Sequence, residues 1–358
     1  MLIGIEAERA NIDQTTGVEH YARQMILALA QIDRQNSYVL YLRTKPRKWI
    51  LDLPENFKYK VIPFPIFWTQ LRISWEMLWH MPDALFVMAS ALPLIHPKQS
   101  VVTIHDLGWE FYPETFGKFM RKYLRFSTWF ACKFAARIIA VSEQTKKDLS
   151  AKYRLPENKV AVVHHGFDMH NELAPENNDP EPVLPEKFIL YLGTLQPRKN
   201  ILGLVDAFLE LKKEKNIPHF LVLAGGKGWL YDKIMEKISA HPEIIYLGYV
   251  KDRFAVLKKA DLLVQPAFYE GFGLQILDAF YCGVPVACSN VSSLPEVGGD
   301  AAVYFDPHSR EDMKRAIFEA LTNAALRAAL VEKGKERLEK FTWKTAAEKT
   351  LKLIAAKN

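Results

Sequence analysis

The sequence predicts an α/β protein with two doubly wound, Rossmann-like domains, each built on a parallel sheet, that face each other across a cleft. Short apolar stretches without polar alternation lie between helical patterns, as expected for parallel sheets covered by helices on both faces. This alternation stops at Met169–Lys187, which contains four prolines among polar residues, and then starts again. The chain has 358 residues, enough for two domains of ordinary size.

The first half of the chain contains the elements of the first domain. A helix is expected at Gly17–Gln31, where apolar side chains recur every three or four residues. The predicted strands are Leu2–Ala7, Tyr38–Leu42, Lys60–Ile62, Ala84–Met88, Ser100–Ile104, Arg137–Val141 and Val160–Val163.

The second half repeats the pattern. Its predicted strands are Phe188–Leu192, Phe220–Ala224, Ile244–Leu247, Leu262–Gln265 and Val284–Ala287. Helices are expected near Ile201–Lys213, Leu230–Ser239, Arg253–Ala260, Leu274–Cys282, Ser309–Lys340 and Trp343–Lys357. We therefore expect an N-terminal domain (1–170), a linker (171–187), a C-terminal domain (188–341) and a C-terminal helix (342–358). The sequence leaves open whether this last helix completes the second domain or packs back on the first.

Composition excludes several classes of protein. Hydrophobic residues make up 49% and charged residues 25%, as in ordinary globular proteins, and the net charge of +6 is too small to indicate nucleic-acid binding. Met1 is followed by Leu2–Ile5 without a positively charged region, so we expect no signal peptide and a cytoplasmic protein. The sequence contains no P-loop, no G-x-S-x-G and no H-E-x-x-H motif. It also lacks D-x-D, so a bound diphosphate is expected to be neutralised by protein groups without a metal.

The most informative stretch for chemistry runs from Pro266 to Ala279. A predicted strand leads into a loop containing Gly271 and Gly273, and an apolar helix follows. The glycines let the backbone approach a ligand closely, and the free amides at the start of the helix favour an anion. Glu270 precedes this anion site and Asp278 lies about two turns into the helix, so the two carboxylates are candidates for contacts with a polyol and a ribose.

This stretch resembles the signature of the family 4 retaining glycosyltransferases, which have the GT-B fold. The resemblance rests on Glu270–Leu274, Asp278-Ala279 and Gly283–Val286. The family pattern has two glutamates, and this chain has Asp278 in the second position, shorter by one methylene. The resemblance implies that Glu270 orients sugar hydroxyls, that Asp278 binds the ribose, and that backbone amides of Gly271, Phe272, Gly273 and Leu274 meet the phosphate or sugar.

Further matches extend the resemblance over roughly residues 1–310. Gly193–Asn200 resembles the family segment after the first strand of the second domain, which implies that Arg198 and Lys199 hold the donor diphosphate. An arginine fork and a lysine point charge suit such a group. The segment ending at Val250 resembles the one that meets the base. In the first domain, Gly17 resembles the glycine near the diphosphate, and His105 the histidine near the transferred sugar.

The implied activity is retaining transfer of a hexose from a nucleotide-sugar donor, without metal or cofactor, to a saccharide or lipid-linked acceptor. Among known members, the first-domain sequence looks most like mannosyltransferases of bacterial polysaccharide and lipopolysaccharide synthesis. GDP-mannose is therefore the favoured donor, and UDP-sugars are the alternative. Another GT-B activity, such as a nucleotide-sugar epimerase or a phosphorylase, and a catalytically silent sugar-nucleotide-binding protein remain alternatives.

Residues 115–142 form a basic segment rich in aromatic side chains. No acidic residue lies between Glu114 and Glu143, whereas this segment contains six cations. A second aromatic-rich stretch lies upstream, between Phe64 and Trp79. A basic amphipathic helix of this kind either lies on an anionic membrane surface or packs its aromatic side chains into the core, with the cations facing solvent. The sequence does not decide between peripheral membrane contact and ordinary packing.

Overall fold

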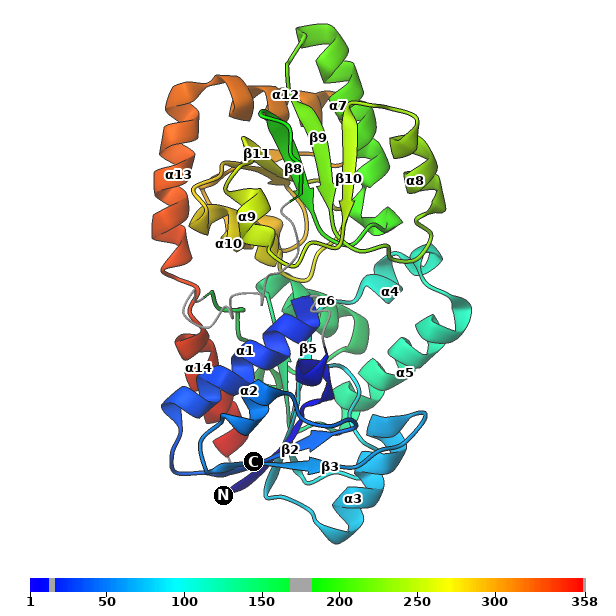
Figure 1. Ribbon diagram of the computed structural model, residues 1–358. Coiled ribbons are helices and arrows are strands. Elements are labelled where there is room, and N and C mark those ends of the chain that lie inside the picture. Colours follow the sequence, from blue (N-terminus) through cyan, green and yellow to red (C-terminus); the bar gives the residue numbers. More distant parts are fainter. Residues whose placement is uncertain (13–16, 168–181, 357–358) are drawn as a thin grey trace. The chain divides into compact units, whose positions relative to one another are not determined.

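The computed structural model describes residues 1–12, 17–167 and 182–356, which fall into two compact units (Figure 1). Unit 1 comprises Met1–Phe111, Gly117–Asn171 and Phe341–Asn358, and unit 2 comprises Tyr112–Phe116 and Glu172–Lys340. Most of the predicted linker lies outside the described residues. Among the described residues, no helix is both long enough and apolar enough to cross a lipid bilayer.

Unit 1 contains a seven-stranded parallel sheet in the order β3-β2-β1-β4-β5-β6-β7. Its strands are β1 (Leu2–Glu6), β2 (Ser37–Leu42), β3 (Phe57–Val61), β4 (Ala84–Val87), β5 (Gln99–Ile104), β6 (Arg137–Ala140) and β7 (Val160–Val162). Its helices are α1 (Gly17–Ile32), α2 (Lys48–Leu51), α3 (Ser74–Trp79), α4 (Gly108–Phe111), α5 (Lys118–Phe134), α6 (Glu143–Tyr153) and α14 (Trp343–Ala355), with a π-helical turn η2 (Trp68–Ile73) before α3.

Unit 2 contains a six-stranded parallel sheet in the order β10-β9-β8-β11-β12-β13. Its strands are β8 (Phe188–Leu192), β9 (Phe220–Ala224), β10 (Ile244–Gly248), β11 (Leu262–Gln265), β12 (Val286–Ser289) and β13 (Ala302–Phe305). Its helices are α7 (Ile201–Lys215), α8 (Asp232–Ser239), α9 (Arg253–Leu257), α10 (Leu274–Tyr281), α11 (Leu294–Gly298), α12 (Arg310–Thr322) and α13 (Ala324–Leu338).

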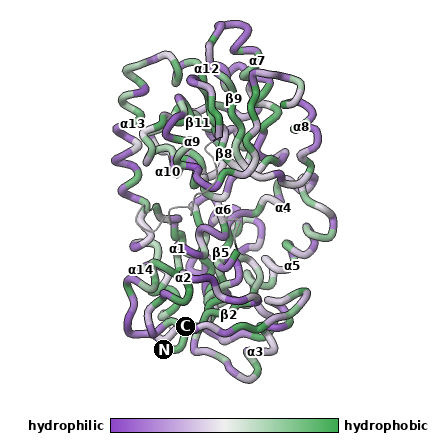
Figure 2. Tube along the Cα trace, in the orientation of Figure 1, coloured by the Kyte–Doolittle hydropathy of each residue, from purple (hydrophilic) through white to green (hydrophobic). Residues whose placement is uncertain are grey.

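Both sheets are doubly wound, so the predicted fold class is confirmed. In each, the chain starts at an inner strand, moves to one edge, and then returns to build the other half. The central strands are buried on both faces: all five residues of β8 are buried, and β8 and β9 are coloured hydrophobic in Figure 2. This burial explains why the strands have continuous apolar sequences instead of alternating ones.

Some predicted elements differ from the observed ones. The strand β13 and the short helix α11 were not predicted, because each has only four or five residues and lacks a clear period. The predicted helix Ser309–Lys340 is two helices, since the Asn323 side chain accepts a hydrogen bond from the Leu326 amide (3.0 Å) and starts α13 anew. The strand β12 begins two residues later than predicted, just after Pro285, which has no amide hydrogen for a sheet.

The helix α14 lies in unit 1, which settles what the sequence left open. It packs beside α1, and Trp343 is 1% exposed within the apolar core of that unit. The chain joins this core where the Phe167 amide donates to the Phe341 carbonyl oxygen at 2.9 Å. Gly166 makes the close approach feasible, because a Cβ there would lie 2.1 Å from the Trp343 nitrogen.

Candidate functional site

The carboxyl ends of β8 and β11 lie side by side at the centre of the second sheet. These strands pair directly, yet the chain runs from β8 toward β10 and from β11 toward β13, so their loops leave in opposite directions. Ligands of doubly wound sheets bind at such a topological switch point. The two loops are joined by a hydrogen bond from the Phe268 amide to the Arg198 carbonyl oxygen at 3.0 Å.

The loop after β8 ends in a tight turn that presents two cations. Pro197–Lys199 forms a single 3₁₀ turn, and Asn200 follows it in a left-handed conformation (φ 54°) that starts α7. The Asn200 side chain donates to the Pro307 carbonyl oxygen at 2.9 Å and fixes the end of the turn. Arg198 and Lys199 are both less than one tenth exposed, so the turn holds their charges inside the protein.

Glu270, in the loop after β11, lies against both cations. The Lys199 ammonium donates to its Oε1, and the Arg198 guanidinium lies 3.8 Å from its Oε2. Arg198 also donates to the Tyr269 carbonyl oxygen. The structure therefore brings Glu270 against Lys199, which lies 71 positions earlier in the sequence, and against its neighbour Arg198. The cluster thus places an arginine and a lysine at a buried position beside one carboxylate, and these two cations suit an anionic ligand.

A glycine loop connects Glu270 to α10. Gly273 has φ 101°, and a Cβ there would lie 2.8 Å from the Leu294 Cδ2 atom, so both the conformation and the space favour glycine. The Ser293 hydroxyl lies 2.9 Å and 3.0 Å from the carbonyl oxygens of Glu270 and Phe272. This contact holds the loop so that the α10 N-terminus, beginning with Leu274, starts beside Glu270. Ser293 was not among the predicted site residues, since only its place after β12 could have indicated it.

Asp278, the expected ribose ligand, lies in α10 and is 4% exposed. Arg253 at the start of α9 holds it with two hydrogen bonds, Nε to Oδ2 at 2.9 Å and Nη2 to Oδ1 at 3.2 Å. The long Arg253 side chain thus reaches the carboxylate of Asp278, which is one methylene shorter than the glutamate of the family pattern. Arg253 was also not among the predicted site residues, although its place three residues after Val250 was a usable signal.

Gly193 and Val250 follow the ends of β8 and β10. The Gly193 amide donates to the Ala224 carbonyl oxygen at 2.9 Å, and the Gly225 amide to the Gly248 carbonyl oxygen at 2.7 Å. A Cβ on Gly225 would lie 2.0 Å from the Gly193 oxygen, so these backbones touch. These contacts hold the carboxyl ends of β8, β9 and β10 close together, and half-buried Val250 lies just after the end of β10.

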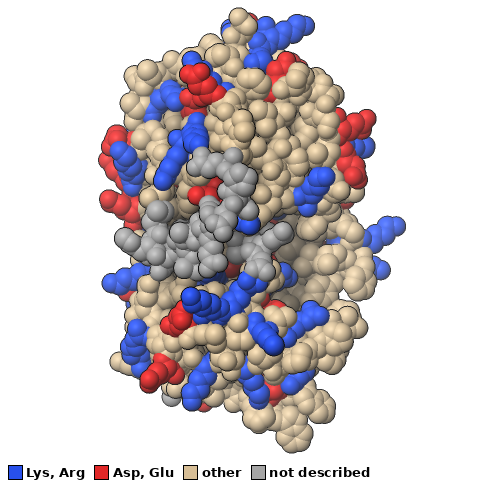
Figure 3. All heavy atoms as spheres, viewed as in Figure 1, with Lys and Arg blue, Asp and Glu red and all other residues tan. Residues whose placement is uncertain are grey.

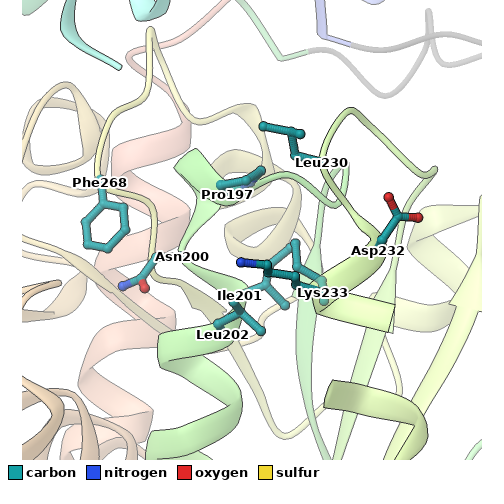
Figure 4. A pocket seen from close by; sticks show the side chains of 9 residues that line it. Pro197, Asn200, Ile201, Leu202, Leu230, Asp232, Lys233 and Phe268 are labelled. Atoms are coloured by element: carbon teal, nitrogen blue, oxygen red, sulfur yellow. The ribbon is translucent and has the colours of Figure 1, made fainter. Parts of the chain in front are cut away.

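A pocket of about 590 Å³ adjoins the cation turn (Figure 4). The turn supplies one wall, and the starts of α7 and α8 supply the others. Most of its side chains are apolar, with one acid and one lysine among them. The lining residues are Pro197, Asn200, Ile201, Leu202, Leu230, Asp232, Lys233, Ile234 and Phe268.

In unit 1, His105 directly follows β5. Its Nε2 lies 2.9 Å from the Met88 carbonyl oxygen, and its ring stands edge-on to the Tyr21 ring with centroids 4.8 Å apart. Burial lowers the pKa of His105, so the ring is neutral near pH 7. Because a carbonyl only accepts, Nε2 carries the proton and Nδ1 is the acceptor.

Gly17 begins α1 in unit 1 and is exposed. Tyr21, one turn later, contacts His105, so the start of α1 and the end of β5 lie at the same edge of the first sheet. Thr15 and Thr16, which precede Gly17 in the segment that resembles the family loop, lie outside the described residues. Glu6 ends β1 at this edge and is 5% exposed, and burial raises its pKa to about 7. Glu6 was not among the predicted site residues.

Comparison with known proteins identifies the family. Residues 175–337 match the family described as "Glycosyl transferases group 1", and residues 15–171 match "Glycosyltransferase Family 4". The O-antigen chain mannosyltransferase B of Escherichia coli is 32% identical over 268 residues, which cover 71% of this chain and 69% of that protein. The chain belongs to the group 1 glycosyltransferases.

Solved structures confirm the fold of this glycosyltransferase. WaaG, a glycosyltransferase involved in lipopolysaccharide biosynthesis, superposes with a TM-score of 0.74 at 17% identity and full coverage of both chains. Alr3699/HepE of Anabaena, in complex with UDP-glucose, has a TM-score of 0.72 at 15% identity and 99% coverage of both chains. The expected GT-B fold is confirmed.

The structure places the candidate site residues of this glycosyltransferase in two groups. Gly17 and His105 lie in unit 1, and the other candidates lie in unit 2. Within unit 2, Arg198, Lys199 and Glu270 form one buried cluster, and the glycine loop adjoins it. Asp278 lies two turns farther along α10, in its pair with Arg253. The roles of these residues remain predictions.

Proposed function

We propose that this glycosyltransferase transfers mannose from GDP-mannose to a saccharide or lipid-linked acceptor in the synthesis of a cell-surface polysaccharide of the O-antigen type, with retention of configuration. The observation that carries this proposal is the buried Arg198–Lys199–Glu270 cluster at the switch point of the second sheet. The similarity to an O-antigen chain mannosyltransferase supports the choice of sugar and process.

In the proposed reaction, the bond between the anomeric carbon and the diphosphate oxygen breaks, and a bond to the acceptor oxygen forms on the same face. The acceptor hydroxyl gives its proton to the departing phosphate, so the products are the glycosylated acceptor and GDP. No protein carboxylate forms a covalent intermediate in this scheme. The negative charge that grows on the leaving diphosphate is the main feature for the protein to stabilise.

The residues of unit 2 suit this demand. Lys199 and Arg198 supply positive charge at a buried position, where electrostatic interactions are stronger than in water. The amides at the start of α10 add partial positive charge beside them. Glu270 accepts hydrogen bonds from sugar hydroxyls, and the Asp278–Arg253 pair contacts the ribose. These protein groups do the work of a metal ion, so we expect a metal-independent reaction.

His105 contributes from unit 1. Its neutral ring has an acceptor at Nδ1, which suits a sugar or acceptor hydroxyl.

The lipid-linked acceptor places the enzyme at the cytoplasmic face of the membrane, attached peripherally. UDP-sugars are the second donor class, because UDP-glucose is the ligand in the Anabaena neighbour.

Purified enzyme incubated with GDP-mannose and a lipid-linked or saccharide acceptor should release GDP and form a mannosylated product. Proton NMR of that product should show the α-anomeric configuration of the donor. A parallel reaction with UDP-glucose tests the second donor class. Release of a nucleoside diphosphate without saccharide product, or a requirement for phosphate, would show an epimerase or phosphorylase instead. Binding without turnover of any donor would show a catalytically silent protein.

A further inference from the structure

Two segments of unit 1 expose an unusual number of large apolar side chains. One covers residues 64–81, around η2 and α3, and the other is α5. Together they hold 13 of the 27 large hydrophobic side chains that are exposed among the described residues, including three of the four exposed tryptophans. Trp75, Trp79 and Phe119 are 60%, 70% and 71% exposed. We call these two segments the aromatic surface. Exposed apolar patches of this kind mark interaction sites.

The two segments are in contact. The Gln70 side-chain amide donates to the Tyr123 hydroxyl at 2.8 Å, and the rings of Phe67 and Tyr123 lie 6.2 Å apart. α3 and α5 lie on the same side of unit 1 (Figure 1), and few charged side chains appear over the lower part of this side in Figure 3. The aromatic surface is therefore one continuous surface.

The orientation of α5 is the reverse of an ordinary amphipathic helix. Its buried residues are small or weakly polar, namely Ser127, Thr128, Ala131 and Cys132. Its large aromatic residues Phe119, Phe126, Trp129 and Phe134 are exposed instead. A helix whose outer face meets only water turns its aromatic side chains toward the core. The outward aromatic face of α5 therefore indicates an apolar partner.

Cations share this exposed face. Lys118, Lys122, Arg125, Trp129 and Lys133 follow one another at intervals of three or four residues, so they lie on one side of α5. All five are exposed, and α5 contains no acidic residue. The Lys133 ammonium lies 5.2 Å and 5.3 Å from the ring centroids of Trp129 and Phe134. Cations among exposed aromatic rings match the chemistry of an anionic lipid interface.

The other segment is compatible with the same partner. Its one acidic residue, Glu76, is 4% exposed and paired with Lys60, Arg72 and His80, so it presents little negative charge to a membrane. Trp75 and Trp79 are one helical turn apart and both exposed. Tryptophan prefers the level of the lipid headgroups.

We propose that the aromatic surface binds the anionic phospholipid face of a bilayer, with the aromatic side chains inserted at headgroup level and the α5 cations against lipid phosphates. This deepens the proposed function, because it specifies how a peripheral enzyme would reach a lipid-linked acceptor. It does not depend on the identity of donor or sugar.

The test is sedimentation of the purified full chain with vesicles of phosphatidylcholine alone or mixed with phosphatidylglycerol, without donor or acceptor. Binding is expected to the anionic vesicles at low salt, weaker at high salt, and weak to the neutral vesicles. Lys118→Glu/Lys122→Glu should lower the partition coefficient about thirtyfold or more, since each cation near such a surface contributes about fivefold. Trp75→Ser/Trp79→Ser should also lower it.

Matched controls are available elsewhere on the chain. Trp229→Ser removes an exposed tryptophan of unit 2, and Lys213→Glu/Lys344→Glu reverses two exposed charges outside the aromatic surface. These variants should bind as the wild type does. Absence of wild-type binding to anionic vesicles at low salt would overturn the proposal, as would equal losses in the control variants. Self-association that requires Trp75 and Trp79 would assign the surface to a second copy instead. None of these readouts needs catalysis, so they leave the proposed reaction separately testable.

Discussion

Replacing Lys199 with alanine is the sharpest test of the cation cluster. Of Arg198 and Lys199, Lys199 lies nearer to Glu270. Because the Lys199 residue is only 9% exposed, bulk water cannot readily replace its ammonium group. With it gone, Glu270 keeps Arg198 at 3.8 Å, and the cluster loses one of its two cations. A diphosphate bound there would then lack the charge of Lys199.

The expected loss follows from this geometry. Removing one preorganised donor to developing charge costs about 2.7–4 kcal/mol of transition-state stabilisation. That energy corresponds to a decrease in kcat/KM of about a hundredfold or more. Lys199→Arg keeps the charge but changes its shape, so its activity should fall between those of the wild type and Lys199→Ala.

The assay is release of nucleoside diphosphate under substrate-limited conditions, with unfolding temperatures measured in parallel. Lys314→Ala is the matched control, because Lys314 is another buried lysine of unit 2, paired with Glu214 and Glu311 away from the site. It should lower the unfolding temperature and leave kcat/KM nearly unchanged. Turnover of Lys199→Ala within a few fold of the wild type would refute the reasoning.

Three further predictions concern the ribose pair, a buried acid and metal ions. Arg253→Ala should raise KM for the nucleotide sugar about tenfold, with a smaller change in kcat, because it removes the group that orients Asp278; an unchanged KM would argue against this role. In the folded protein, burial raises the pKa of Glu6, which lies near Arg9 and Glu8, to about 7, so Glu6 ionises more easily in the unfolded chain. The free energy of unfolding therefore decreases as pH rises from about 4.5 through 7. Glu6→Gln should therefore raise the unfolding temperature relative to the wild type more at pH 8 than at pH 5, and the opposite order would contradict the assigned pKa. Dialysis against EDTA should leave transfer activity unchanged, whereas loss of activity that Mg²⁺ or Mn²⁺ restores would show that a metal takes part.

The local sequence pattern was sufficient to predict most of the fold, whereas Arg198 and Lys199 became candidates through the family resemblance. Uninterrupted apolar strands predicted both sheets, and the loop positions of Arg198, Lys199 and Glu270 followed from the strands before them. The ion pair between Arg253 and Asp278 could not be predicted from local sequence pattern, because it depends on how α9 and α10 are rotated against each other. The same limit applied to Ser293, which reaches Glu270 only through the packing of the loop after β12.

The aromatic residues of α5 show a different limit. Their spacing predicts an amphipathic helix, but spacing does not state which face turns inward. Only the packing of Ser127, Thr128 and Ala131 against the rest of unit 1 showed that the aromatic face points outward. The tertiary contacts therefore show which face of α5 is buried, and membrane contact stays a prediction.

The return of the chain to unit 1 has a consequence for how the protein is made. During translation, residues 1–167 emerge from the ribosome long before α14, yet Trp343 belongs to their apolar core. This earlier part of the polypeptide therefore remains incompletely packed while unit 2 is synthesised. A fragment cut at the proline-rich stretch would expose the core residues that α14 covers, and it should need α14, added as a separate peptide, to become a stable domain.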